Sequence, residues 1–362
     1  RAGKVEEVQT YKTLSESREA WNGTHWWHPK DKYNLQKLIF KSLSPFQPNG
    51  VLLGDQIYNT FYSDILINLT KKMNIPIAVY CHGLDVRQWL TPMLKREYFQ
   101  YLYGVVTGLR SPRQKAFRCL RKADIIFTNS TYTAGLVNKA VGREAIVTGC
   151  GINDTDWERE KNLVPHYSPE IKKKWRHELQ LPEKPTIGFV GRLVPSKNVA
   201  VLIRAIAKID DAQLVIIGDG PRREILQELA QEQDVSSRIC WLGKVTEEQK
   251  WKYLRAMDVF CLPSKPLPGG QVEGFGIVLL EAAAAGTPVI GSNAGGIPDV
   301  IKDGETGLLC TPDEHKAWIN SITKILKQKR FATQFVENSR VKLINQFNWN
   351  YISETIISHI VK

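Results

Sequence analysis

The chain has 362 residues, which is too long for one ordinary hydrophobic core and predicts two domains. Hydrophobic residues make up 43% of the chain and charged residues 24%, close to the averages of folded soluble proteins, so a disordered or fibrous protein is excluded. The formal net charge of +12 predicts attraction to phosphates, nucleic acid or an anionic membrane surface.

The chain is expected to be cytoplasmic. No apolar run approaches the ~18 to 20 residues that a bilayer-spanning helix needs, and nothing at Arg1 resembles a secretion signal. The cysteines lie far apart, with no CxxC pair and no neighbouring histidine cluster, so we predict free buried thiols and no metal site.

Short apolar runs recur along the chain, and each is followed by a stretch of helical periodicity. This pattern predicts parallel sheets covered by helices, an α/β fold. The predicted strands are Gly50 to Leu53, Ile77 to Cys81, Ile125 to Thr128, Thr186 to Val190, Leu214 to Ile217, Val259 to Leu262 and Pro288 to Gly291. Val5 to Thr10 looks like a second strand, so the N-terminal domain is expected to lack its opening strand, loop and helix.

Four prolines and many charges between Asn162 and Pro185 predict a linker, with a helix at Pro169 to Leu179. The expected division is a first domain at 1–165, a linker at 166–185 and a second domain at 186–348. The last segment, 349–362, has apolar residues at helical spacing and needs a partner surface: Trp349, Ile352, Ile356, Ile357 and Ile360.

A glycine-rich turn predicts a diphosphate site in the second domain. Gly274 and Gly276 lack side chains, so backbone N–H groups can approach an anion, and the helix that begins near Ile277 directs its positive end there. Glu281, about one turn into that helix, can accept hydrogen bonds from ribose hydroxyls, and Glu273 can face a sugar beyond the phosphates. A lone GxG turn of this kind is also ordinary α/β architecture.

The loop Gly191 to Asn198 follows a predicted strand of the same sheet, at the edge where such folds bind ligands. Arg192 offers a planar fork and Lys197 a mobile charge, and both suit the oxygens of a diphosphate. Taken alone, the two side chains could equally be an ordinary solvated pair.

Together these motifs resemble the family 4 glycosyltransferases. The resemblance covers nearly the whole chain in the order His82 to Asp85, Asn129 with Ser130, Gly149 to Asn153, Gly191 to Lys197, Gly218 to Pro221, Glu273 with Glu281, Asn293 to Asp299, and Asp303 to Gly307. The terminal helix is similar to the one that, in this family, crosses back onto the first domain. The family's first strand and glycine-rich loop have no counterpart here.

The resemblance implies a GT-B fold, with two Rossmann-like domains facing a central cleft, and a retaining transfer of a hexose from GDP-mannose or a UDP-sugar. It implies catalytic roles for His82, Glu273, Arg192 and Lys197, and a donor site made by Gly191, Arg192, Lys197, Gly274, Phe275, Gly276, Ile277 and Glu281. Cationic side chains and N–H groups would neutralise the diphosphate, so no metal is required.

The stretch Arg87 to Lys122 has nine cations, a single acid and six interleaved aromatic residues. This composition suits an anionic membrane surface, so the acceptor is expected to be a glycan or a lipid-linked molecule at the inner face of the membrane. A solvated face over an apolar core is the alternative. A nucleic-acid binder, a non-catalytic nucleotide-binding remnant and a sugar-phosphate synthase are the rival functions; the chain lacks the usual nucleic-acid motifs, and no nucleic-acid partner is expected.

Overall fold

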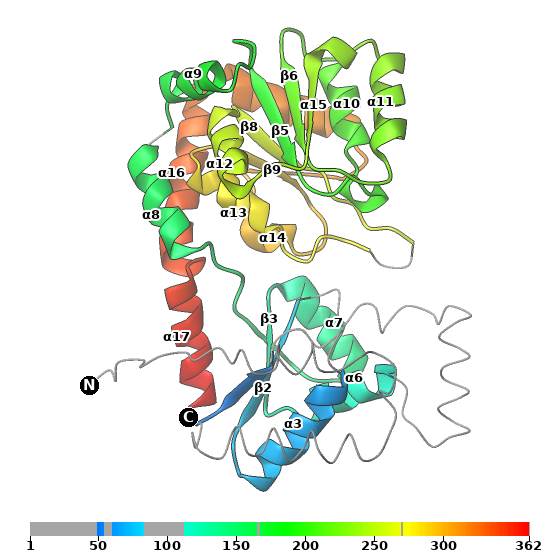
Figure 1. Cartoon of the computed structure of the whole chain (residues 1–362), viewed down its shortest axis with the longest axis vertical. Helices are drawn as coiled ribbons and strands as arrows, with labels where there is room; N and C mark the ends of the chain where they lie inside the picture. Colours follow the sequence, from blue (N-terminus) through cyan, green and yellow to red (C-terminus); the bar gives the residue numbers. More distant parts are fainter. Residues whose placement is uncertain (1–48, 54–59, 83–111, 165–166, 269–270, 362) are drawn as a thin grey trace.

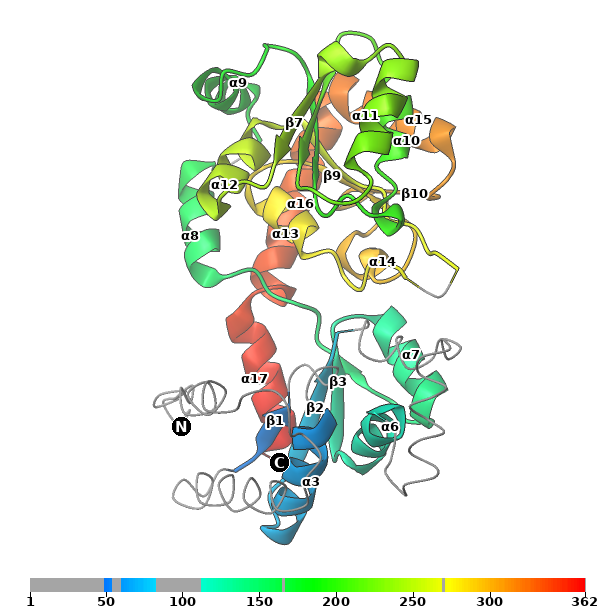
Figure 2. The same ribbon diagram turned by 45° about the vertical axis from the view of Figure 1, so that its right-hand side comes forward.

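The computed structural model describes residues 49–53, 60–82, 112–164, 167–268 and 271–361. The expected strand at Val5 to Thr10 lies outside these residues. Two α/β domains are arranged one above the other, and the helices at the C-terminal end of the chain run from the upper domain to the lower one (Figure 1). A second view shows the same arrangement (Figure 2).

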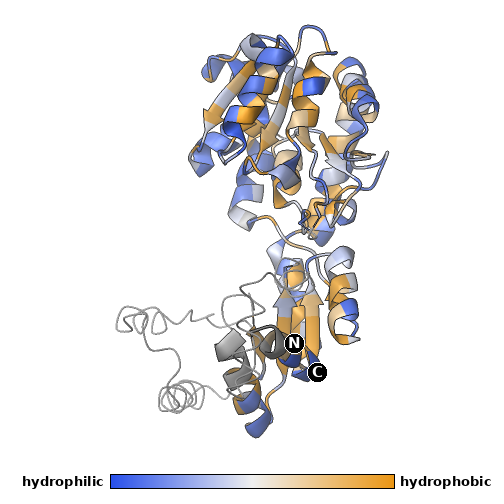
Figure 3. Cartoon of the chain, turned by 90° about the vertical axis from the view of Figure 1, so that its right-hand side faces the viewer, coloured by the Kyte–Doolittle hydropathy of each residue, from blue (hydrophilic) through white to orange (hydrophobic). Residues whose placement is uncertain are grey.

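The N-terminal domain contains a parallel sheet with the strand order β1-β2-β3-β4. The sheet is formed by β1 (Val51–Leu53), β2 (Ile77–Cys81), β3 (Ile125–Thr128) and β4 (Ile146–Val147), and its helices are α3 (Thr60–Lys72), α6 (Pro112–Lys122) and α7 (Thr131–Val141). Every residue of β2 is buried, as expected for a parallel strand with both faces covered. These strands accordingly have the hydrophobic colour over most of their length in Figure 3, which is coloured by residue hydropathy.

The C-terminal domain contains a six-stranded parallel sheet with the order β10-β9-β8-β5-β6-β7. Its strands are β5 (Thr186–Val190), β6 (Gln213–Ile217), β7 (Ile239–Gly243), β8 (Val259–Leu262), β9 (Val289–Ser292) and β10 (Leu308–Cys310). The chain builds the sheet in one direction from β5 to β7 and in the other direction from β8 to β10. The reversal lies between β5 and β8, and open α/β sheets bind ligands at such a point.

The helices of this half pack around that sheet and extend beyond it. They are α8 (Asp154–Leu163), α9 (Pro169–Glu178), α10 (Ala200–Ile206), α11 (Arg223–Glu232), α12 (Glu247–Ala256), α13 (Ile277–Ala284), α14 (Ile297–Val300), α15 (His315–Lys327), α16 (Lys329–Gln346) and α17 (Trp349–Ile360), with short 3₁₀ turns η1 (Pro195–Lys197) and η2 (Ser236–Arg238). Local signals set several starts: Thr246 and Gln249 form a capping box at α12.

The terminal helix α17 packs on the N-terminal sheet. Ile352, Ile356 and Ile360 are buried in one cluster with Tyr80 and Phe127. The other two residues of the predicted apolar stripe, Trp349 and Ile357, are exposed. Hydrogen bonding also joins the two crossings between the domains, because the backbone N–H of Ile152 donates to the carbonyl of Phe347 at 2.8 Å.

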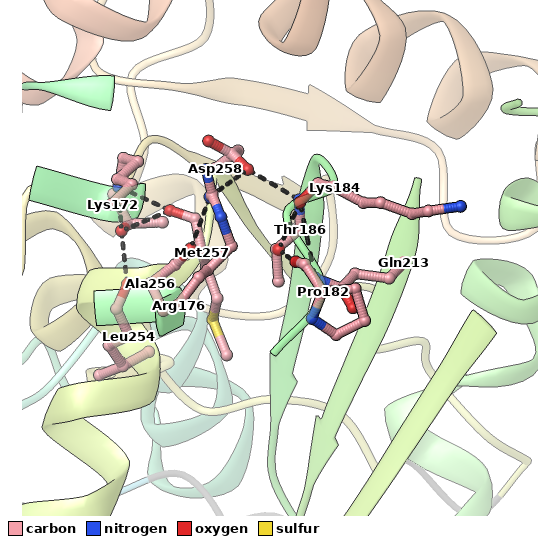
Figure 4. A network of polar contacts seen from close by, with 11 residues as sticks. Lys172, Arg176, Pro182, Lys184, Thr186, Gln213, Leu254, Ala256, Met257 and Asp258 are labelled. Carbon is pink, nitrogen blue, oxygen red and sulfur yellow. Dashed lines mark hydrogen bonds and ion pairs between the residues drawn. The ribbon is translucent and has the colours of Figure 1, made fainter. Parts of the chain in front are cut away.

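Helix α9 lies in the segment predicted as a linker, and it is anchored to the C-terminal sheet by a buried polar network (Figure 4). Lys172 Nζ donates to the Met257 carbonyl at 2.6 Å and to Thr287 Oγ1 at 3.0 Å. Arg176 pairs with Asp258 at 2.9 Å, and the same carboxylate oxygen accepts the backbone N–H of Thr186 at 2.7 Å. The network therefore fixes α9 to the start of β5.

Lys172 should make stability depend on pH. Burial lowers its pKa from 10.5 to about 7, although Asp258 acts in the opposite direction. Above about pH 7 the unfolded chain therefore binds one more proton at this site, and stability rises with pH. We expect the unfolding free energy to increase by up to about 1.4 kcal/mol per pH unit between about pH 7 and pH 9.

Urea unfolding of the wild type and of Lys172→Met at both pH values measures this effect. The increase should disappear in Lys172→Met and persist in Lys173→Met, whose side chain is 64% exposed and pairs with Glu183 on the surface. An unchanged pH dependence in Lys172→Met would contradict the assignment.

Candidate functional site

The loops that follow β5 and β8 lie side by side at the carboxyl edge of the C-terminal sheet, where the strand order reverses. A backbone hydrogen bond joins the two loops, from the N–H of Lys265 to the carbonyl of Ser196 at 2.8 Å. The loop after β6 packs closely against the loop after β5. A Cβ at Gly218, where φ is +122°, would lie 2.0 Å from the Gly191 carbonyl oxygen. Three glycine-containing loops therefore converge at the reversal point.

A cation and an acid meet between the first two loops. Lys197, the last residue of η1, forms a hydrogen-bonded ion pair with Glu273. Ser264 Oγ donates to the same carboxylate oxygen at 3.5 Å. Both members of the pair are partly buried, with side-chain exposures of 22% and 17%. The sequence placed these two side chains in separate motifs, and the fold brings them into contact.

The turn that leads into α13 has the geometry of an anion site. Gly276 caps the helix with φ of +94°, a conformation that glycine adopts readily. The first turn of a helix leaves N–H groups without intrahelical partners, and these groups carry the positive end of the helix dipole. Ile277, the first residue of α13, is exposed, so this end of the helix is open to solvent.

The loop between β9 and α14 packs against the turn that leads into α13. Gly296 donates its backbone N–H to the carbonyl of Glu273 at 3.0 Å. A Cβ at Gly296 would lie 2.0 Å from the carbonyl oxygen of Gly274, and one at Gly295 would lie 2.2 Å from that of Glu273. These two glycines allow a close backbone contact that fixes the position of Glu273.

Gly296→Ala should therefore lower the unfolding free energy, by about 1–3 kcal/mol as for other overpacking substitutions. Gly135→Ala is the matched control, because a Cβ there meets nothing within 4 Å. Gly135 lies inside α7, so alanine should stabilise the helix by about 1 kcal/mol. Urea unfolding measures both variants. If Gly296→Ala were as stable as the wild type, the two loops would not be in contact as described.

Glu281 lies one turn into α13 and pairs with a lysine of the neighbouring helix. Its Oε1 is 2.9 Å from Lys250 Nζ, and the same ammonium contacts Glu247. Burial raises the pKa of the Glu281 carboxyl, and Lys250 opposes this effect. The ion pairs raise the pKa of Lys250 despite its burial. Sequence reasoning identified Glu281 but not Lys250, since no motif contains the lysine.

Two further predicted residues lie at the edges of this site. Arg192, at the start of the loop after β5, is exposed to solvent. Phe275 is buried, and its ring packs edge-on against Phe347 with the centroids 5.6 Å apart. The aromatic side chain therefore anchors the turn before α13 to the end of α16.

His82 belongs to the N-terminal domain and lies opposite the turn that leads into α13. It follows β2, its side chain is exposed, and its ring centroid is 4.7 Å from that of Tyr80. Asn129 Nδ2 donates to its carbonyl oxygen at 3.2 Å, and a Cβ at Gly274 would lie 2.8 Å from that oxygen. The carboxyl ends of β2 and β8 therefore face each other across the domain boundary.

Sequence reasoning missed a second contact between the domains. Asp299 Oδ2 accepts hydrogen bonds from the backbone N–H of Thr131 at 3.2 Å and from its hydroxyl at 3.0 Å. Thr131 is the first residue of α7, so the carboxylate lies at the positive end of that helix. The two residues are 168 positions apart, and no spacing in the sequence relates them.

A metal-binding cluster and a membrane-spanning helix are both absent from the described residues. No group of three or more His, Cys, Asp or Glu side chains among them is arranged to hold a metal ion. Within the same residues, no helix combines the length and the apolar character needed to cross a membrane. All six cysteines lie among the described residues and none forms a disulfide; five are buried and Cys240 is partly exposed.

Comparison with known proteins agrees with this geometry. Residues 171–342 match the family model "Glycosyl transferases group 1". This half of the chain is therefore similar to the group 1 glycosyltransferases. A curated relative, the GDP-mannose-dependent alpha-(1-6)-phosphatidylinositol monomannoside mannosyltransferase of Mycobacterium tuberculosis, is 31% identical over 237 residues, 64% of this chain and 60% of the relative. The chain thus matches about three fifths of that relative's length.

The similarity to solved structures covers both domains of the chain, not only its C-terminal half. The Anabaena protein Alr3699/HepE in complex with UDP has a TM-score of 0.69 at 19% identity, covering 90% of this chain and 82% of its own. A glycosyltransferase from Rickettsia africae has a TM-score of 0.69 at 19% identity, covering 97% and 88%. The GT-B fold, with two Rossmann-like domains, is confirmed.

The stretch predicted to face a membrane, 87–122, lies mostly outside the described residues. Only its last part is described, as α6 beside α7 in the N-terminal domain (Figure 1). The motif residues Gly83, Leu84 and Asp85 that follow His82 also lie outside the described residues.

Proposed function

We propose that this protein is a retaining glycosyltransferase that moves a hexose from GDP-mannose or a UDP-sugar to a glycan or a lipid-linked acceptor. One observation carries the proposal: Lys197 and Glu273 meet at the reversal point of the C-terminal sheet, beside the open start of α13. A cation, an acid and helical N–H groups at one edge are what a sugar joined to a diphosphate requires.

In the proposed reaction, the bond between the sugar and the diphosphate breaks and negative charge builds on the leaving phosphate. Lys197, Arg192 and the N–H groups at Gly276 and Ile277 stabilise that charge, because they place positive charge and hydrogen-bond donors beside the leaving phosphate. Phosphate binding draws the ammonium of Lys197 away from Glu273. The released carboxylate of Glu273 then accepts hydrogen bonds from the sugar hydroxyls.

The second domain supplies the other side of the proposed site. His82 lies next to Gly274, so its side chain contacts the donor sugar or the acceptor hydroxyl in this proposal. The acceptor binds the N-terminal domain. The contact between Thr131 and Asp299 holds the two domains together at this edge.

The donor and the acceptor are inferred by comparison. The mycobacterial relative is named for GDP-mannose and for a phosphatidylinositol acceptor, which supports a mannosyl donor and a lipid-linked acceptor here. The Anabaena structure contains UDP, which supports a UDP-sugar. We propose a cytoplasmic location at the inner face of the membrane, and the lack of a disulfide among the six described cysteines is consistent with a reducing compartment.

The test is a transfer assay with the full chain. GDP-mannose, UDP-glucose and UDP-N-acetylglucosamine are each incubated with glycan and lipid-linked acceptors, and NMR follows the anomeric proton of the product. One donor should yield a glycoside with the anomeric configuration of that donor. A product of inverted configuration would contradict retention. Nucleotide binding without transfer to any acceptor would instead identify a non-catalytic remnant.

A further inference from the structure

The inference concerns Lys250, and it rests on the proposed function of Glu281 in the donor site. We infer that Lys250 is a positioning residue that holds the Glu281 carboxylate ionised and oriented toward the ribose of the nucleotide. The contact is direct, since Lys250 Nζ lies 2.9 Å from Glu281 Oε1. It joins α12 to α13 beside the proposed diphosphate site.

The surrounding structure holds Lys250 in place. Its side chain is 13% exposed, and its ammonium lies 5.5 Å from the centre of the buried Trp251 ring. The capping box of Thr246 and Gln249 fixes the start of α12 one turn earlier. Near the other end of the helix, Arg255 donates to Glu160 at 2.7 Å in a buried pair. The helix that carries Lys250 is therefore held near both of its ends.

The charges around Glu281 indicate that this contact acts on the ionisation of Glu281 and does not only pack the two helices. The acids that face it are Glu247 on α12 and Asp156 on α8, and the facing cation is Lys250. Arg159, also on α8, is occupied by Asp156 at 2.8 Å and by Glu160 at 2.9 Å. Removing Lys250 would leave a partly buried carboxyl among acids.

Protonation of Glu281 would weaken its contact with a ribose. An ionised carboxylate has two acceptor oxygens for the two neighbouring hydroxyls, whereas a protonated one has a hydroxyl in place of one acceptor. Burial already raises the pKa of this carboxyl. Loss of the lysine should raise it further, so nucleotide affinity should fall as the pH is lowered through the new pKa.

Calorimetric titration of the full chain with UDP and GDP between about pH 5.5 and pH 8 tests this effect. The wild type should bind one nucleotide and sets the reference profile, which includes the ionisation of the nucleotide's own phosphate at about pH 6. From the high to the low end, Lys250→Met should lose about ten-fold or more affinity beyond the change in the wild type. Lys250→Arg should restore the wild-type profile, because it returns the cation.

Lys252→Met is the matched control. Lys252 lies on the same helix and pairs with Glu178 and Glu248, away from Glu281. It should keep the wild-type profile, and thermal unfolding verifies that every variant is folded. A Lys250→Met profile equal to that of the wild type would overturn the inference alone. If neither nucleotide binds the wild type, the proposed donor site fails and the inference fails with it.

Discussion

Lys197→Met is expected to lower sugar transfer about 100- to 1,000-fold, the usual effect of removing one group that stabilises developing charge. The ammonium lies beside Glu273 at the reversal point of the sheet, where the proposed diphosphate leaves. Because that charge grows mainly in the transition state, kcat should fall more than KM rises. Steady-state kinetics with the donor found in the transfer assay separate the two effects.

A control is needed, because methionine also leaves Glu273 partly buried without its cation. Glu273→Gln removes that charge and should still lose transfer, through lost contacts to the sugar. Lys302→Met, at an exposed pair with Glu305, should transfer at the wild-type rate. Wild-type kcat in Lys197→Met would exclude Lys197 from charge stabilisation.

Glu281→Ala is expected to weaken nucleotide binding about 10- to 100-fold, since a hydrogen bond to a charged group contributes about 1.5–3 kcal/mol. The carboxylate lies one turn from the open end of α13, where a ribose follows the diphosphate. Calorimetric titration with UDP and GDP measures the loss. Glu305→Ala, at the exposed pair with Lys302, should bind like the wild type.

The 2′-deoxy nucleotides make this prediction specific to the ribose. A nucleotide without the 2′-hydroxyl should bind the wild type less tightly than its ribose parent. The two should bind Glu281→Ala equally, because the partner of that hydroxyl is gone. An equal penalty for the deoxy nucleotide in both proteins would place Glu281 away from the ribose.

The sequence predicted most of the sheet framework, because buried parallel strands are continuous apolar runs. The seven strands predicted within the described residues are all present, with ends shifted by one residue in β1, β6 and β9, and the predicted strand at Val5 to Thr10 lies outside those residues. Three further strands in the described part of the chain carried weaker signals. Ile146 and Val147 form a strand of two residues, β7 is mostly only partly buried, and Leu308–Cys310 is a three-residue strand.

The sequence predicted the motifs of the candidate site, but it did not predict which side chains are in contact. Glycines followed by a helix indicated the turn at Gly276, because that chemistry is local. The pairing of Glu281 with Lys250 and that of Thr131 with Asp299 depend on how helices pack, and no local pattern reports them. Lys172 shows the same limit: its charge predicts exposure, yet the Met257 carbonyl and the Thr287 hydroxyl accept hydrogen bonds from it inside the fold.

The most direct test of the donor site is a thermal-shift panel of UDP, GDP, ADP and their sugar conjugates against the full chain and Glu281→Ala. Ligand at about 100 times its Kd stabilises the native state by about 2.7 kcal/mol, enough to raise the melting temperature clearly. We predict that nucleotides of one base raise it in the wild type and raise it by a smaller amount in Glu281→Ala. If no nucleotide changed the melting temperature of the wild type, the C-terminal domain would not be a nucleotide-sugar site.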